Sequence, residues 1–220
     1  MRTTTIGDVR ILLPDLDPED LDDVHDSASD LSEASIEGVS WRGAQLDDVS
    51  IRSSRIAGAD LSESAWESGT IWGSEITRTD LSGATLSGVT VERCAFTGSR
   101  FTGTRLTDVR LKDVLFDGCR FDYATFQRVV AAGATAFNDC TLTNATWSFC
   151  RLPKVAIRSC QLTNLEFESC QLQGADLRGN RLQNLKGALV NLRGVTLAQE
   201  QLSELTRLAI AELGVDVRTD

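Results

Sequence analysis

Six cysteines have the most reactive side chains of this 220-residue sequence. Thiolates bind zinc and pair as disulfides, so these two kinds of chemistry are considered first. No Cys-x-x-Cys pair occurs, which disfavours a zinc site. The last four cysteines recur every ten residues, which indicates that a regular architecture positions them. The six are Cys94, Cys119, Cys140, Cys150, Cys160 and Cys170.

The remaining residues predict no active site. His25 is the only histidine and lies in an acidic stretch, where a solvated polar role is expected. The sequence has no phosphate-binding glycine loop, no HExxH and no Ser/His/Asp constellation. We therefore expect a protein that is not an enzyme and that holds no cofactor and no metal ion.

A five-residue period sets the positions of the cysteines. From Leu31 to Phe126 every fifth residue is large and apolar, and the residue two places earlier is almost always small. A fixed period predicts a repeat architecture. Five fits neither a helix stripe nor a strand face, so the chain must turn once per repeat. Glycine or asparagine, such as Gly58, Gly98 and Asn144, often follows two places after the large residue, where it suits a tight turn.

The repeat resembles that of the pentapeptide-repeat family, with the consensus Ala-(Asp/Asn)-Leu-x-x. Residues 59–63 (Ala-Asp-Leu-Ser-Glu) and 175–179 (Ala-Asp-Leu-Arg-Gly) match it, and the resemblance covers about residues 27–197. It implies an all-β solenoid, a right-handed quadrilateral β-helix with four pentapeptides per coil. A twenty-residue recurrence of Asn144, Asn164 and Asn184 agrees with four.

All six cysteines occupy the small inward position of this repeat, so we expect buried thiols that behave as small apolar residues. Cys140 with Cys160, or Cys150 with Cys170, would stack within disulfide distance. A reducing cytoplasm disfavours such a bond.

The repeat is interrupted once and ends in distinct segments. Within 127–136 the phase shifts by one residue, which leaves open a bulge or a protruding functional loop. Residues 1–26 are expected to form an N-terminal cap, 27–197 the β-helix, and 198–220 a capping helix and short strand. The resemblance implies a two-fold dimer through this C-terminal end. The predicted dimerisation residues are Leu202, Leu205, Leu208, Ile210, Leu213, Val215 and Val217.

The charge is unevenly distributed. Residues 1–90 carry 18 acidic and 6 basic side chains, whereas residues 91–220 carry 14 and 16. A basic belt at 93–128 breaks the acidic character. An acidic surface repels nucleic acids and anionic membranes and favours basic partners. The chain also has no apolar run long enough for a membrane span or a secretory signal, so a cytoplasmic location is expected.

Exposed aromatic residues complete the expected binding surface. By phase, Trp72, Leu115, Tyr123 and Phe149 point outward, and exposed aromatic residues are reasonable interface anchors. The predicted partner-binding residues are Asp47, Asp48, Asp60, Glu63, Glu67, Glu75, Asp80, Trp72, Tyr123 and Phe149.

Two functions remain open. The resemblance implies a DNA-mimicking protein that binds a type II topoisomerase, DNA gyrase or topoisomerase IV, and protects it from or modulates inhibitors. The alternative is a protein-binding scaffold or regulatory module with an unrelated partner.

Overall fold

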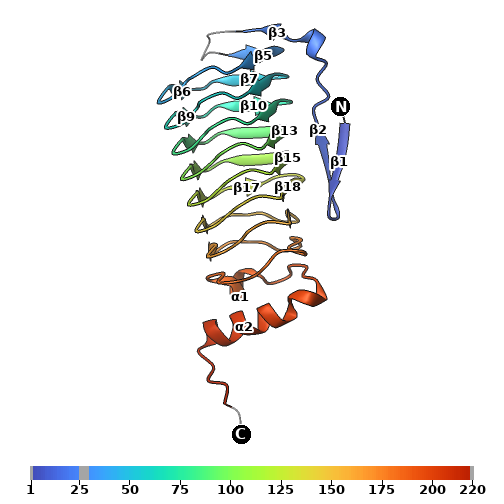
Figure 1. Cartoon of the computed structure of the whole chain (residues 1–220), viewed down its shortest axis with the longest axis vertical. Coiled ribbons are helices and arrows are strands. Elements are labelled where there is room, and N and C mark those ends of the chain that lie inside the picture. Colours follow the sequence, from blue (N-terminus) through green and yellow to red (C-terminus); the bar gives the residue numbers. More distant parts are fainter. Residues whose placement is uncertain (1, 25–29, 219–220) are drawn as a thin grey trace.

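The computed structural model describes residues 2–24 and 30–218. It is a rod of stacked coils with a β-hairpin along one side and a helix at the C-terminal end (Figure 1). His25 and Asp26 lie outside the described residues. No helix in the described part of the chain is long and apolar enough to span a bilayer.

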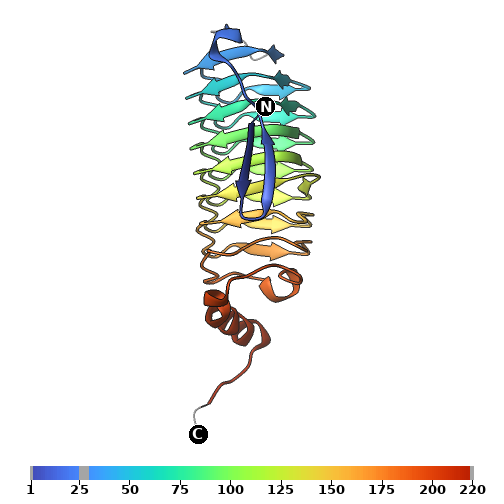
Figure 2. The ribbon, with the colours of Figure 1, turned by 90° about the vertical axis from the view of Figure 1, so that its right-hand side faces the viewer.

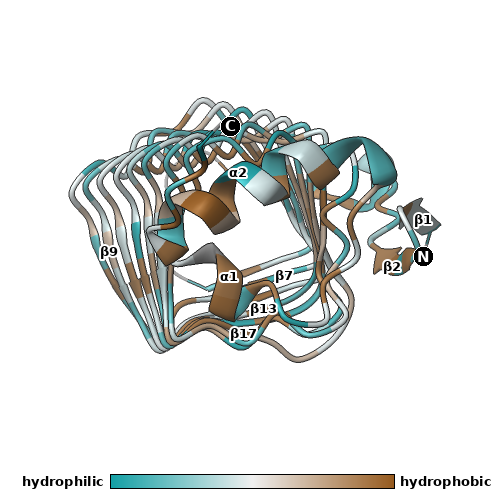
Figure 3. Ribbon diagram, turned by 90° about the horizontal axis from the view of Figure 1, so that it is seen from below, coloured by the Kyte–Doolittle hydropathy of each residue, from teal (hydrophilic) through white to brown (hydrophobic). Residues whose placement is uncertain are grey.

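Each coil has four sides, which we name faces A to D. Neighbouring coils pair in parallel with a twenty-residue offset, as in Ile51↔Ile71↔Val91, and Figure 3 shows the four-sided outline. Face A carries β4 (Leu31–Ser32), β7 (Ser50–Arg52), β10 (Thr70–Trp72), β17 (Val130–Ala131) and the first parts of β13 (Thr90–Thr97) and β15 (Arg110–Asp117). Face B carries β3 (Asp22–Asp23), β5 (Ala34–Glu37), β8 (Arg55–Ala57), β11 (Glu75–Thr77), the remainder of β13 and β15, β18 (Thr135–Asn138) and β20 (Ala156–Arg158).

The other two faces are paired differently. Isolated bridges such as Asp60↔Asp80 and Arg100↔Arg120 hold face C together. Face D carries β6 (Gln45–Asp47), β9 (Ala65–Glu67), β12 (Thr85–Ser87), β14 (Arg105–Thr107), β16 (Thr125–Gln127), β19 (Thr146–Ser148) and β21 (Glu166–Glu168). The predicted β-helix with a C-terminal helical cap is confirmed.

The large repeat positions fill the rod. Every predicted large position from Leu31 to Phe126 is buried, and Phe101 is 2% exposed. Phe96, Phe116 and Phe137 stack from coil to coil with ring centroids 5.0 and 4.9 Å apart. The period of five therefore predicts the core because each repeat returns one large side chain to the axis.

The phase shift is a one-residue bulge. Leu111 pairs with Ala131 at an offset of 20, whereas Val114 pairs with Thr135 at an offset of 21. The extra residue lies among 132–134, three small residues on the way from face A to face B. Of the two alternatives that the sequence left open, the structure has the bulge, which adds no protruding loop.

The N-terminal segment differs from the prediction. β1 (Arg2–Ile6) and β2 (Val9–Leu13) form an antiparallel hairpin that lies lengthwise on face B, across its strands (Figure 2). Residues 2–13 therefore do not cap the first coil; only β3 and its neighbours extend the rod beyond β5. The reason is an outward apolar column of Ala95, Leu115, Ala136 and Ala156, which the hairpin buries with Ile11 and Leu13.

The C-terminal end also differs in detail. A short helix α1 (Ala188–Asn191) precedes the 3-10 turn η2 (Gln199–Gln201) and helix α2 (Leu202–Leu213). The other 3-10 turn, η1 (Pro18–Asp20), lies in the N-terminal segment. Helix α2 begins at Leu202, after η2, whereas the capping segment was expected from residue 198. Gln201 and Leu208 point inward, whereas Leu202 is 54% exposed. Residues 215–218 form no strand, which corrects that expectation.

Candidate protein-binding surfaces

Five of the predicted acidic residues gather at the N-terminal end of faces C and D. We call this set the acidic edge: Asp47, Asp48, Asp60, Glu63 and Glu67. The repeat phase places them there, since Asp60 lies outward on face C and Glu63 at the next corner. Asp47, Asp48 and Glu67 are exposed, and within the described residues none of the three has an ion-pair partner. The acidic edge therefore presents uncompensated negative charge.

The two other members of the acidic edge have specific contacts. Ser62 donates its hydroxyl and its backbone N–H to Asp60 Oδ1 at 2.6 and 3.0 Å, which lowers the pKa of that carboxyl. Arg42 pairs with Glu63 at 2.7 Å, with both side chains about 60% exposed. An exposed pair of this kind is weak, so a partner can replace it.

Two predicted acidic residues lie elsewhere. Asp80 stacks on Asp60 as predicted but forms an ion pair with Arg100 at 3.0 Å. Glu75 lies on face B, 15% exposed, where Arg2 and Arg55 pair with it at 2.9 and 3.4 Å. Glu75 therefore serves the hairpin rather than an open surface. The sequence phase could not show this, because Arg2 lies outside the repeat.

Of the four large apolar residues predicted to point outward, two are exposed and two are covered by other parts of the chain. Tyr123 is 65% exposed and Phe149 is 52% exposed, at corners that flank face D. Both have a positive φ, 61° and 56°, which is unusual for a bulky residue. Trp72 is half-buried beneath the Arg93 guanidinium, whose carbon is 5.7 Å from the ring centroid. Leu115 is buried under the hairpin, so the expectation that it is exposed was wrong.

The hairpin is held at both of its ends by charge. Arg2 pairs with Glu75 near one end, and Asp8 in the hairpin turn pairs with Arg178 at 2.7 Å. Asp176 accepts from Arg158 and Arg178 at 2.8 and 2.9 Å. Burial alone would raise the pKa of Asp176, but these hydrogen bonds outweigh it and hold that pKa at about 2. Leu115, an apolar residue in an outward position, was the only sequence signal for this contact.

The C-terminal end leaves apolar surface uncovered. Leu208 is 7% exposed and Leu205 packs against the core, so both belong to the cap. Ile210 is half-buried. The exposed remainder of the predicted dimerisation set is Leu202 at 54%, Leu213 at 69%, Val215 at 51% and Val217 at 67%.

The cysteines line the interior and make no surface site. All six are buried, as the repeat phase predicts, and are free thiols. Burial raises the pKa of Cys94 to about 12. Hydrogen bonds with the thiols of Cys119 and Cys160, together with burial, raise the pKa of Cys140. Such thiols are poor nucleophiles. No group of three or more potential metal ligands was found within the described residues.

Comparison with known proteins agrees with the fold. The family described as pentapeptide repeats matches residues 29–64 and 74–113, in eight copies. The match covers about a third of the chain, and the coils that follow residue 113 continue the same four-sided architecture. No curated protein matches the sequence.

Among solved structures, a trypsin-treated variant of QnrB1, a plasmid-mediated fluoroquinolone resistance protein, is similar to the chain. It has 16% sequence identity and a TM-score of 0.52, over 84% of this chain and 100% of that one. HetL, a pentapeptide-repeat protein involved in heterocyst differentiation regulation in Nostoc sp. strain PCC 7120, has 17% identity and a TM-score of 0.21. That match covers 78% of this chain and 90% of HetL. At 16% identity the likeness to the QnrB1 variant concerns the fold alone.

Proposed function

We propose that this protein is a non-enzymatic DNA mimic that binds a type II topoisomerase, DNA gyrase or topoisomerase IV, and protects it from inhibitors or modulates them. The acidic edge carries the proposal. The similarity in fold to a QnrB1 variant, named as a fluoroquinolone resistance protein, supports it. Because type II topoisomerases act on the chromosome, the proposal includes a cytoplasmic location. It includes no direct binding of nucleic acid or membrane, since an acidic surface repels both.

The density of charge on the acidic edge suits this role. Coils in a β-helix stack about 4.8 Å apart, so the two coils that carry Asp47 to Glu67 span about 9.6 Å. The five carboxylates of the acidic edge over that length give about one per 1.9 Å, compared with one charge per about 1.7 Å of duplex DNA. From Arg100 onward, basic side chains interrupt faces C and D. We therefore confine the mimicry to the N-terminal part of the rod.

Tyr123 and Phe149 extend the proposed contact along face D. Both are exposed at corners of neighbouring coils, beyond the acidic edge. Exposed aromatic side chains bury a large area at a small cost in conformational entropy. The acidic edge would then steer association, whereas these two rings would slow dissociation.

We also propose a homodimer through the C-terminal end. Leu202, Leu213, Val215 and Val217 leave apolar side chains in water at the tip of the rod, where α2 lies (Figure 1). Leu213→Asp combined with Val217→Asp should yield a monomer, whereas Thr206→Asp, at an exposed polar position of α2, should not. A monomeric wild type in light scattering would refute the dimer.

The test of the function is binding to purified gyrase, followed by drug-induced DNA cleavage. The triple variant Asp47→Lys, Asp48→Lys, Glu67→Lys removes the uncompensated charges. Its control, Asp139→Lys, Glu200→Lys, Asp216→Lys, makes the same charge change at exposed positions of the C-terminal half, and each triple includes one corner residue with positive φ.

The wild type should bind gyrase at low salt and reduce ciprofloxacin-induced cleavage. The acidic-edge triple should bind at least about tenfold more weakly, mainly through a slower association rate. If both triple variants weaken gyrase binding equally, net charge is the cause, and the acidic edge is not the specific contact surface. Absence of binding at low salt, with no change in cleavage, would favour the scaffold with an unrelated partner.

A further inference from the structure

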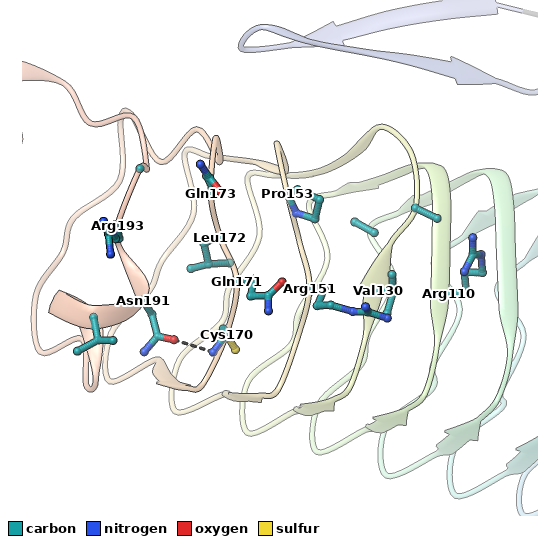
Figure 4. A pocket seen from close by; sticks show the side chains of 14 residues that line it. Arg110, Val130, Arg151, Pro153, Cys170, Gln171, Leu172, Gln173, Asn191 and Arg193 are labelled. Atoms are coloured by element: carbon teal, nitrogen blue, oxygen red, sulfur yellow. Dashed lines mark hydrogen bonds between the residues drawn. The ribbon is translucent and has the colours of Figure 1, made fainter.

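A groove runs along face A in the C-terminal half of the rod, far from the acidic edge. It begins at Arg110 and ends near Gly194, with a cavity volume of about 1010 Å³. Its floor is apolar, with Val130, Ala132 and Pro153 in neighbouring coils. Figure 4 shows these coils with the side chains that line the groove.

The one-residue bulge produces the low floor of this groove. On face A of this coil Ala131 points inward and is buried, Val130 points outward, and the next three residues are alanine, glycine and alanine. The Lys112 side chain lies over Gly133, where a Cβ would be 2.7 Å from Lys112 Cγ. Lys112 itself pairs with Glu92 at 2.9 Å. The coil of the bulge therefore has no tall side chain of its own on face A.

Three arginines border the floor. Arg110, Arg151 and Arg193 are exposed, and none of them has an ion-pair partner among the described residues. Arg110 pairs in register with Val130, and Val130 with Arg151, so two coils separate the two arginines. Their separation along the rod is therefore about 9.6 Å. Arg193 lies two further coils along and is displaced toward the next corner.

This spacing fits an extended acidic polypeptide. A polyproline II segment has three residues per turn and rises about 3.1 Å per residue, so every third side chain points the same way about 9.3 Å apart. Acidic residues at every third position would meet Arg110 and Arg151 in turn. Such a segment also leaves its own backbone groups free for Gln171 and Gln173, which line the groove.

A nucleic acid fits the groove less well. Single strands bind proteins through aromatic platforms on which the bases stack, and the lining residues include no Phe, Tyr or Trp. The net charge of −10 and the acidic edge also repel a long polyanion. A short acidic segment can occupy the groove without approaching that end.

We propose that this groove binds an extended acidic segment of a partner protein, with an acidic residue at every third position. The site is separate from the acidic edge and does not depend on topoisomerase binding. It gives a role to the phase shift and to Arg110 of the basic belt.

The probe is a fluorescent twelve-residue peptide with four Glu-Pro-Pro repeats, compared with a peptide of the same composition whose four glutamates are adjacent. The groove variant is Arg110→Glu, Arg151→Glu, Arg193→Glu. The matched control is Arg105→Glu, Arg120→Glu, Arg181→Glu, three exposed arginines on faces C and D. A second variant, Ala132→Glu, places one negative charge on the exposed floor without removing an arginine.

Fluorescence anisotropy should show that the wild type binds the spaced peptide more tightly than the clustered one. The groove variant and Ala132→Glu should each weaken binding, the former by about tenfold or more, whereas the control triple should change it by less than about threefold. Circular dichroism checks that every variant keeps the rod. No binding at low salt, equal binding of the two peptides, equal weakening by both triples, or tighter binding of a single-stranded oligonucleotide would overturn the proposal.

Discussion

Replacing Ile11 by alanine tests whether the β1–β2 hairpin can detach from face B while the rod stays folded. Ile11 is fully buried against the column that contains Leu115. The change removes three buried carbon atoms at about 0.8 kcal/mol each, so docking should weaken by about 2.4 kcal/mol before any cavity term. That energy corresponds to about a 50-fold rise in the opening equilibrium.

Amide hydrogen exchange measured by mass spectrometry reads this equilibrium directly. Exchange in residues 2–13 should accelerate about 50-fold, while the coils from Ile51 to Phe167 keep their protection, because local opening does not require the rod to unfold. Leu12→Ala is the matched control, since Leu12 lies on the same strand with its side chain 38% exposed. It should accelerate exchange by no more than about twofold.

Two results would refute this reasoning. Equal acceleration in Ile11→Ala and Leu12→Ala would mean that burial on face B does not hold the hairpin. Loss of protection throughout the coils of Ile11→Ala would mean that hairpin and rod unfold as one cooperative unit.

Three further predictions concern the rod and its ends. Arg178 and Arg158 hold the pKa of Asp176 at about 2 in the fold, compared with 3.8 ordinarily, so its contribution to the stability of the rod is present above about pH 4 and lost as the pH falls toward 2. The free energy of unfolding should therefore fall more steeply across that window in the wild type than in Asp176→Asn; the same pH dependence in both proteins would contradict this. The Asn191 side chain accepts from Cys170 N–H at 2.6 Å and donates to Phe167 and Gly187 carbonyls, so Asn191→Leu should destabilise the last coil by about 2–4 kcal/mol. Unchanged exchange in residues 167–197 would refute that role. Phe101→Asp places a carboxyl in the aromatic core at a cost of several kcal/mol, and a wild-type melting curve would rule out the repeat register.

The sequence predicts the interior of the rod well and its attachments poorly. The core residues from Leu31 to Phe126 follow from the period alone, because each coil places the same repeat position inward. The hairpin could not be predicted, because Ile6 and Ile11 keep the five-residue phase and no local pattern indicates an antiparallel pair; residues 1–26 were therefore expected to cap the first coil. Its contacts join Asp8 to Arg178, 170 residues away, which no local pattern reveals.

The same limit applies to the candidate surfaces. The phase places Asp60 and Asp80 in one column correctly, but only the structure shows that Arg100 compensates Asp80. At the C-terminus the apolar residues predict a helix that covers the last coil, but they do not show how the helix is oriented on it. Leu208 packs against the core, whereas Leu202 and Leu213 are exposed.

The central claim is that the acidic edge occupies the DNA-binding surface of a type II topoisomerase. Displacement of a fluorescent duplex from purified gyrase, measured at about 50 mM salt where charge is weakly screened, tests it most directly. The wild type should displace the duplex, and the variant with Asp47, Asp48 and Glu67 changed to lysine should fail to do so, while the C-terminal control triple displaces it normally. A wild type that leaves the duplex bound, or that binds gyrase and duplex together, would contradict the mimicry.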